Sequence, residues 1–231
     1  MAKNIVLVHL KSSDTMELQI PSTKNQTMKK GRVAVLLSGR GSNFTAMVRD
    51  SRKANANFSI CLVISDRKDA PGLKKAVRLG IPAYHINPKQ FSDKAAYENE
   101  ICAYLERENI ELICLAGYMR LVGPVLLARY PGRIMNIHPA LLPSFPGLDA
   151  QEQALHYGVK VSGCTVHFVD AGTDSGPVIV QRAVAVRGDD NADILSKRIL
   201  LQEHRLYPRA IRLYFARRLQ IRGRIVIITD K

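Results

Sequence analysis

The chain has 231 residues, of which 46% are hydrophobic and 23% charged, an ordinary composition for a soluble folded protein. No apolar stretch approaches the roughly 20 residues of a membrane span, and no signal peptide is recognisable at the start. Four cysteines are scattered without the spacing of a zinc site or of a disulfide framework. We therefore expect a cytoplasmic protein with reduced thiols, no bound metal and no membrane partner.

The net charge of +14 is unusual and raises the question of a nucleic-acid partner. Seven arginines and no acidic residue lie from Arg205 to Arg224, but the apolar residues among them predict a helix with a solvated basic face. No known nucleic-acid motif accompanies them. Attraction for anionic metabolites, or solubility, explains the charge better, and we do not expect nucleic acid as a partner. The purpose of this basic segment stays open.

The beginning of the chain differs from the rest. Residues 1–30 are polar and contain several lysines after a short apolar piece. The first apolar run typical of a strand buried on both faces begins at Val33. We expect an N-terminal extension over residues 1–30, disordered in part, and a single domain over residues 31–231.

A glycine loop follows the first expected strand, residues 33–37. It reads Ser-Gly-Arg-Gly-Ser-Asn, ends at Asn43 and leads directly into a helical pattern. Such a loop exposes backbone N–H groups at the positive end of a helix, which suits a phosphate. It is not the dinucleotide-binding fingerprint, because that motif needs a third glycine where Phe44 stands. A tight turn that binds nothing is the alternative.

Strand-like and helix-like segments alternate along the chain. This order predicts an α/β fold with a Rossmann-like, mostly parallel sheet flanked by helices. A short turn-rich loop between two later strands predicts antiparallel strands added toward the C-terminus. We expect Ser92 to cap one helix, and Pro208 marks a point at which the last helix could break. The expected strands are residues 33–37, 59–65, 83–86, 111–115, 133–138, 162–169, 177–186 and 225–228. The first expected helix starts at residue 44, and the later ones span residues 72–79, 92–107, 124–130, 151–157 and 190–215.

Asn136 and His138 close the expected strand over residues 133–138. Because they are two residues apart, their side chains project from the same face of that strand. One can hold a developing oxyanion and the other can move a proton. The proline-rich loop over residues 139–147 then stops the strand and stiffens the chain at the sheet edge where α/β proteins bind ligands. A lone histidine near a strand end is more often structural, so other residues must support this interpretation.

Asp174 is an acid that could serve His138. It lies in the turn-rich loop over residues 170–176, between two strands that we expect to form a hairpin. A carboxylate within reach of the imidazole would orient the ring and favour its protonated form.

Five stretches together resemble the folate-dependent formyltransferase superfamily and, within it, the glycinamide ribonucleotide formyltransferases of purine synthesis. They lie in order between Val33 and Phe215 and read S-G-R-G-S-N, A-G-Y-M-R, N-I-H-P-A-L-L-P-S-F-P-G-L, G-C-T-V-H-F-V-D-A-G-T-D-S-G-P-V-I-V-Q and Q-E-H-R-L-Y-P. The resemblance implies the formyltransferase fold. It also implies direct attack by the amine of glycinamide ribonucleotide on the formyl carbon of 10-formyltetrahydrofolate, the co-substrate, without a metal.

The resemblance assigns roles to individual residues. Asn136, His138 and Asp174 match the family's catalytic trio, with Asn136 also beside the folate. Lys94 stands where relatives often carry an arginine, which keeps a cation and loses the planar fork. The residues expected to bind the ribonucleotide are Gly41, Ser42, Asn43 and Glu203, and those expected to bind folate are Lys94, Met119, Arg120, Leu121, Val122 and Asn136.

Other members of the superfamily are the nearest alternatives. Formyltetrahydrofolate hydrolase and methionyl-tRNA formyltransferase share the Asn-x-His and Asp elements. The first usually carries an N-terminal regulatory domain, for which the segment before Gly31 is too short, and the second a C-terminal domain, for which no room follows Phe215. A phosphometabolite-binding or nucleic-acid-binding module would leave the trio unexplained. We therefore expect small-molecule substrates as partners of a monomer or homodimer.

Overall fold

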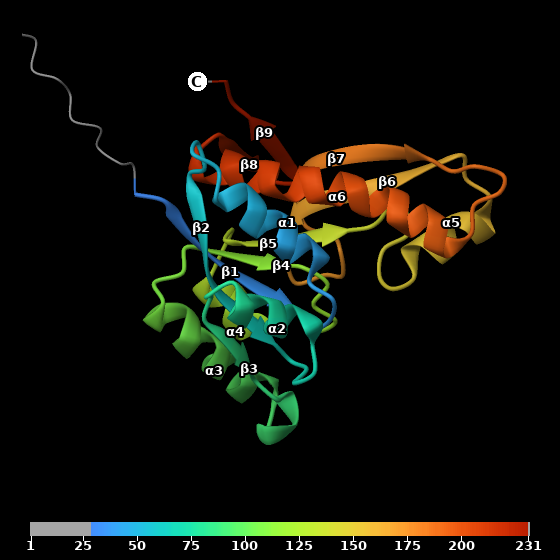
Figure 1. The fold of residues 1–231 in the computed structure, drawn as a ribbon. Coiled ribbons are helices and arrows are strands. Elements are labelled where there is room, and N and C mark those ends of the chain that lie inside the picture. The colour runs from blue at the N-terminus through green and yellow to red at the C-terminus, as the bar shows by residue number, and fades with distance from the viewer. Residues whose placement is uncertain (1–28, 231) are drawn as a thin grey trace, which may run out of the picture.

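The computed structural model describes residues 29–230, so residues 1–28 of the expected N-terminal extension lie outside the described part of the chain. Nine strands form one sheet in the order β3-β2-β1-β4-β5-β6-β7-β9-β8 (Figure 1). The strands are β1 (Gly31–Leu37), β2 (Phe58–Ser65), β3 (Ala83–His85), β4 (Leu112–Leu115), β5 (Ile134–His138), β6 (Val161–Phe168), β7 (Val178–Ala185), β8 (Leu219–Arg222) and β9 (Ile225–Ile228). The helices are α1 (Ser42–Ser51), α2 (Pro71–Arg78), α3 (Lys94–Arg107), α4 (Pro124–Arg129), α5 (Ala150–Tyr157), α6 (Ala192–Phe215) and the short 3₁₀ helix η1 (Pro88–Gln90).

The pairing of the strands confirms the predicted sheet. β3, β2, β1, β4 and β5 run parallel, whereas β6 is antiparallel to both β5 and β7. From β1 the chain first builds outward through β2 to β3 and then returns to the other side of β1 with β4. The loops after β1 and β4 therefore diverge at the carboxyl edge of the sheet, which is where open α/β sheets bind their ligands.

Helices cover both faces of the sheet. In β1, Val33, Val35 and Leu37 pack with α1 and α6, whereas Ala34 and Leu36 pack with α3 on the other face. Figure 1 shows α1 and α6 above the parallel strands and α3 and α4 below them. Burial of both faces explains why these strands are continuous apolar runs in the sequence. None of the helices in residues 29–230 is long and apolar enough to cross a membrane.

One expectation about the helices was wrong, and one alternative that the sequence left open is decided. Asp93, and not Ser92, caps α3, because its carboxylate accepts a hydrogen bond from the backbone N–H of Ala96 at 2.7 Å. Pro208 lies inside α6 and does not end it. The residues around this proline, including Tyr207 and Ile211, are fully buried in the core, and their packing outweighs the backbone hydrogen bond that proline cannot make.

The basic segment from Arg205 to Arg224 contains more than the expected helix. Its first part does form the end of α6, with Arg205 and Arg209 exposed, as predicted. Its second part forms β8, which pairs antiparallel with β9 around a turn at Gly223 with a positive φ of 59°. The sequence pattern did not predict β8, because its four residues include only two apolar side chains.

Candidate active site

Ser38 ties together three loops at the carboxyl edge of the sheet. Its hydroxyl donates a hydrogen bond to Asp66 Oδ1 at 2.6 Å and accepts one from the backbone N–H of Met119 at 2.9 Å. Its own backbone N–H donates to the carbonyl of Gly117 at 2.9 Å. The loops after β1, β2 and β4 are thus held against one another beside the end of β5.

Asn136, His138 and Asp174 lie together, as the sequence predicted. Asn136 Nδ2 donates to Asp174 Oδ1 at 3.2 Å, and His138 Nδ1 lies 3.1 Å from Asp174 Oδ2. The same Oδ2 accepts the backbone N–H of Gly147 at 2.8 Å, which joins the proline-rich loop to the cluster. Since both strand residues contact one carboxylate, they do project from the same face of β5.

His167 is a fourth member of this cluster that the sequence analysis did not include. It faces Asn136 across the antiparallel β5–β6 pair, and its Nε2 lies 3.2 Å from Asn136 Nδ2 and 3.5 Å from Asp174 Oδ1. Its Nδ1 lies 2.8 Å from the carbonyl of Phe168, so in the neutral ring Nδ1 carries the proton and Nε2 accepts from Asn136. Both amide hydrogens of Asn136 are then engaged, one by His167 and one by Asp174.

The protonation of His138 differs from the expectation. Burial lowers the pKa of His138, and this outweighs the upward effects of the Asp174 charge and of the Phe145 carbonyl, while His167 lowers it further. Asp174 thus acts in the predicted direction but does not make the protonated ring the favoured form. The ring is still built to receive a second proton, because Nε2 lies 2.7 Å from the Phe145 carbonyl and Nδ1 faces the carboxylate of Asp174.

Asp174 itself stays ionised. Burial alone would raise the pKa of this carboxyl, but the adjacent His167 ring, the hydrogen bond from the backbone of Gly147 and the charges that His138 and His167 carry when protonated outweigh it and lower the pKa. A fixed negative charge beside His138 can stabilise an imidazolium that forms during a reaction.

The predicted ribonucleotide residues also lie together. Gly41 precedes α1 with a φ of 67°, and Ser42 and Asn43 begin the helix, so their backbone N–H groups point out from its positive end. A Cβ at position 41 would lie 2.9 Å from the Cα of Gly72, so only glycine fits there without a shift. Asn43 Nδ2 donates to Glu203 Oε2 at 2.7 Å across 160 residues of sequence.

Glu203 lies in a drier environment than Asp174. Burial raises the pKa of the Glu203 carboxyl, and the single hydrogen bond from Asn43 lowers it by less. Asn43 Oδ1 is buried and has no hydrogen-bond partner among residues 29–230. Such an unpaired acceptor next to a carboxyl suits a ligand hydroxyl.

The predicted folate loop after β4 is held by a buried acid that the sequence analysis missed. The carboxylate of Glu98, from α3, accepts the backbone N–H groups of Gly123, Val125 and Leu126, the last two at 3.2 and 3.3 Å. The side chain of Lys94 packs closely against Gly123: a Cβ atom added to Gly123 would lie 2.6 Å from Lys94 Cε. A glutamate inside a helix is usually exposed, so the sequence held no signal for this contact.

Large side chains of the folate loop point to solvent. Met119 and Leu121 are 64% and 66% exposed, and Val122 is half-buried. The guanidinium of Arg120 lies over the ring of Tyr97, 5.4 Å from its centre. Exposed apolar side chains beside a polar cluster favour an aromatic ligand that would cover them.

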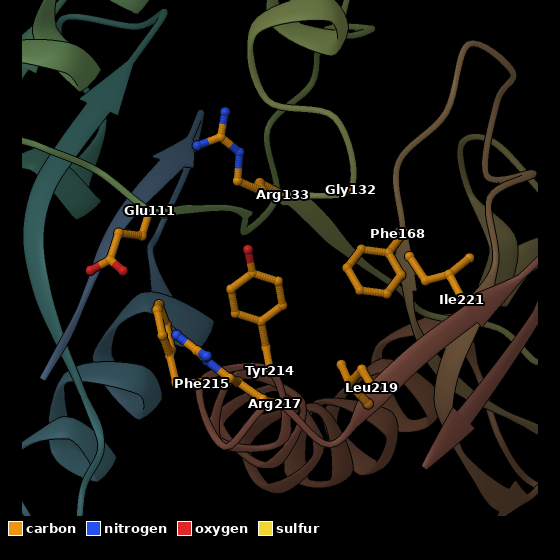
Figure 2. Close-up of a pocket in the computed structure, with 9 residues that line it drawn as sticks. All are labelled: Glu111, Gly132, Arg133, Phe168, Tyr214, Phe215, Arg217, Leu219 and Ile221. Carbon is orange, nitrogen blue, oxygen red and sulfur yellow. The ribbon is translucent and has the colours of Figure 1, made fainter. Parts of the chain in front are cut away.

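A cavity of about 460 Å³ lies away from this cluster, at the amino edge of the sheet (Figure 2). Gly132 and Arg133, just before β5, border it on one side, and Tyr214 and Phe215 at the end of α6 border it on another. None of the predicted site residues lines this cavity. We therefore place the candidate site at the carboxyl edge of the sheet.

Comparisons with known proteins point to one family. The sequence profile of the Formyl transferase family matches residues 31–211. Phosphoribosylglycinamide formyltransferase of Bacillus subtilis is 45% identical over 185 residues, which are 80% of this chain and 94% of that protein. The crystal structure of glycinamide ribonucleotide transformylase 1 from Symbiobacterium toebii has a TM-score of 0.86 and 49% identity, covering 87% of this chain and 95% of that one.

A longer relative matches only in part. The human trifunctional purine biosynthetic protein adenosine-3 is 45% identical over 185 residues, which are 80% of this chain and 18% of that protein. The chain therefore spans less than a fifth of the length of this relative.

Proposed function

This chain belongs to the formyl transferase family, and on that premise we propose that it transfers the formyl group of 10-formyltetrahydrofolate to the amine of glycinamide ribonucleotide, a step of de novo purine biosynthesis. The observation that carries the proposal is the connected cluster of Asn136, His138 and Asp174. It lies at the carboxyl end of β5, the strand next to β4, and the strand order of the sheet changes direction between β1 and β4.

The two substrates would approach from different loops. The N–H groups at the start of α1 would bind the phosphate of the ribonucleotide, and Asn43 with Glu203 would bind its ribose hydroxyls. The loop from Met119 to Val122, with Lys94 at its side, would bind the folate. β4 and β5 are neighbours with Leu115 opposite Asn136, so a folate in this loop would present its formyl group close to the cluster.

The chemistry would begin with attack of the neutral amine on the formyl carbon. The carbonyl oxygen gains a negative charge, and Asn136 can donate a hydrogen bond to it once one amide hydrogen leaves Asp174. His138, neutral in the free protein, accepts the proton that the amine loses, and the carboxylate of Asp174 stabilises the resulting imidazolium. The tetrahedral intermediate then collapses, the bond to folate nitrogen breaks, and that nitrogen takes the proton from His138. The scheme requires no metal.

The proposal includes small-molecule substrates as the partners and a cytoplasmic location. The same cluster could also serve hydrolysis or formylation of initiator tRNA, because each of these reactions passes through a similar tetrahedral intermediate. The identity of the acceptor therefore has to be tested directly.

The test compares acceptors. The full chain is incubated with 10-formyltetrahydrofolate alone, with glycinamide ribonucleotide and with initiator tRNA, and loss of the formyl group from folate is followed by absorbance. We expect rapid deformylation only with the ribonucleotide. Deformylation that needs no acceptor would identify a hydrolase, acceleration by tRNA alone would identify a tRNA formyltransferase, and no reaction under any condition would favour a binding module.

A further inference from the structure

The loop over residues 170–176, which we call the Asp174 loop, is held by contacts within itself. Asp170 Oδ1 accepts the Ser175 hydroxyl at 2.6 Å and the backbone N–H of Gly172 at 3.1 Å. At its end the loop packs on β6, since a Cβ at Gly176 would lie 1.8 Å from the carbonyl oxygen of Phe168. Asp174 nevertheless has a positive φ of 49°, which is unfavourable for a residue with a side chain. The loop therefore gains from support outside itself.

The C-terminal hairpin, formed by β8 and β9, supplies such a support. Arg224 lies in the hairpin turn, between β8 and β9, and its Nη2 donates a hydrogen bond to the backbone carbonyl of Ser175 at 2.9 Å. Ser175 is the residue directly after Asp174. Within residues 29–230 this is the one side-chain hydrogen bond between the hairpin and the Asp174 loop.

The rest of the hairpin is joined to the protein by apolar packing and by little strand pairing. Its only strand pairing with β7 in the described chain is the single position at which Val178 faces Ile225. Leu219, Val226 and Ile228 pack against the core cluster that contains Phe168, and Leu219 and Ile221 border the cavity of Figure 2 together with Phe168. Arg224 thus adds a specific polar contact to a hairpin that is otherwise held by apolar packing. The hairpin also lies outside residues 31–211, which the family profile matches.

We propose that Arg224 is a positioning residue for formyl transfer, holding the Asp174 loop so that both carboxylate oxygens stay in contact with Asn136 and His138. The proposal rests on the proposed function. One hydrogen bond from a charged donor fixes the backbone next to Asp174, whose oxygens must stay at 3.1 and 3.2 Å from their partners. The contact is exposed and single, so its loss should slow turnover by about three- to tenfold without unfolding the protein.

Kinetics of three variants of the full chain test this role. Arg224→Ala should lower kcat by about three- to tenfold and leave KM for glycinamide ribonucleotide within about twofold. Arg222→Ala is the matched control, because Arg222 lies in the same hairpin, is exposed, and has a side chain that makes no hydrogen bond or ion pair with the described residues. Arg224→Lys should recover part of the loss, since one donor suffices for one carbonyl. Equal kcat values for Arg224→Ala and Arg222→Ala would overturn the proposal.

A second measurement does not depend on activity. The chain contains no tryptophan, so Ala171→Trp places a single reporter at an exposed position of the Asp174 loop. In this background Arg224→Ala should lower the fluorescence anisotropy of the reporter, and Arg222→Ala should not. An unchanged anisotropy with Arg224→Ala would show that the hairpin does not hold the loop. If the parent protein fails to transfer formyl groups while the anisotropy falls, the proposed function is wrong and the contact still restrains the loop.

Discussion

The pKa values of two carboxyl groups of the site, those of Asp174 and Glu203, are shifted in opposite directions. Asp174 receives hydrogen bonds from several directions and lies beside two histidines, and its pKa is lowered in spite of burial. Glu203 receives one hydrogen bond, from Asn43, and burial raises its pKa. Glu203 is both more deeply buried than Asp174 and surrounded by fewer donors and charges, and the two differences together explain the opposite directions of the pKa shifts. This difference suits Asp174 for stabilising a proton on His138 and Glu203 for binding hydroxyl groups.

The comparison predicts that changes around Asp174 alter kcat, whereas changes around Glu203 alter KM for the ribonucleotide. The largest effect is expected for His138→Ala, which removes the group that moves the proton. Steady-state kinetics should show kcat lower by at least about a hundredfold with little change in KM. The control is His156→Ala, which removes an exposed histidine of α5. Turnover near the parent value would remove His138 from the mechanism.

The second largest effect is expected for Asp174→Asn, and it is measured by comparing the pH profile of kcat/KM of this variant with that of the parent protein. The reaction needs neutral His138 in the free protein, so kcat/KM should fall as the pH drops through the His138 pKa, which lies below its ordinary value of 6.5. The charge of Asp174 raises this pKa, so its removal should shift the acid limb to lower pH and lower kcat by at least about tenfold.

Asp189→Asn provides the control for this profile, because it removes an equal charge at an exposed position. Its acid limb should match that of the parent protein. A shift of the Asp174→Asn limb to higher pH would contradict the electrostatics described here.

A smaller effect is expected for Glu203→Gln. Glutamine can still accept the hydrogen bond from Asn43, but it binds hydroxyl groups more weakly than a carboxylate does. KM for glycinamide ribonucleotide should rise by about tenfold while kcat stays within about threefold. Glu152→Gln, at an exposed position of α5, is the matched control. A loss of kcat at unchanged KM would erase the distinction between the two acids.

The smallest effect lies outside both regions and should alter stability alone. Asp93→Ala removes the cap of α3 and should lower the free energy of unfolding by about 1 kcal/mol, as measured by urea denaturation. Ser92→Ala should change it by less than about 0.5 kcal/mol. The reverse order of the two variants would restore Ser92 as the cap.

The sequence was sufficient to predict the parallel part of the sheet and the position of Asn136 and His138. Both follow from local patterns, namely apolar runs that alternate with helices and two polar residues spaced for one face of a strand. For Asp174 the sequence showed an acid in a turn-rich loop, and the resemblance to a family was needed to assign its role, since its contacts with β5 span more than 30 residues of sequence. The structure shows these residues in contact, and their catalytic roles stay predictions.

What the sequence could not predict depends on distant packing. His167 joins the cluster because the antiparallel register places it opposite Asn136. Glu98 is buried because the backbone of a different helix, α4, supplies its hydrogen-bond donors. The protonation of His138 depends on how much water the folded chain excludes from it. No pattern along the chain reports any of these three properties.

The most direct test of formyl transfer follows the formyl carbon itself. The full chain is supplied with 10-formyltetrahydrofolate carrying a ¹³C-labelled formyl group and with glycinamide ribonucleotide, and the label is observed by NMR. We predict that it appears as the formamide of the ribonucleotide in step with the release of tetrahydrofolate. Label that appears as free formate, at a rate that does not depend on the ribonucleotide, would contradict the proposed function.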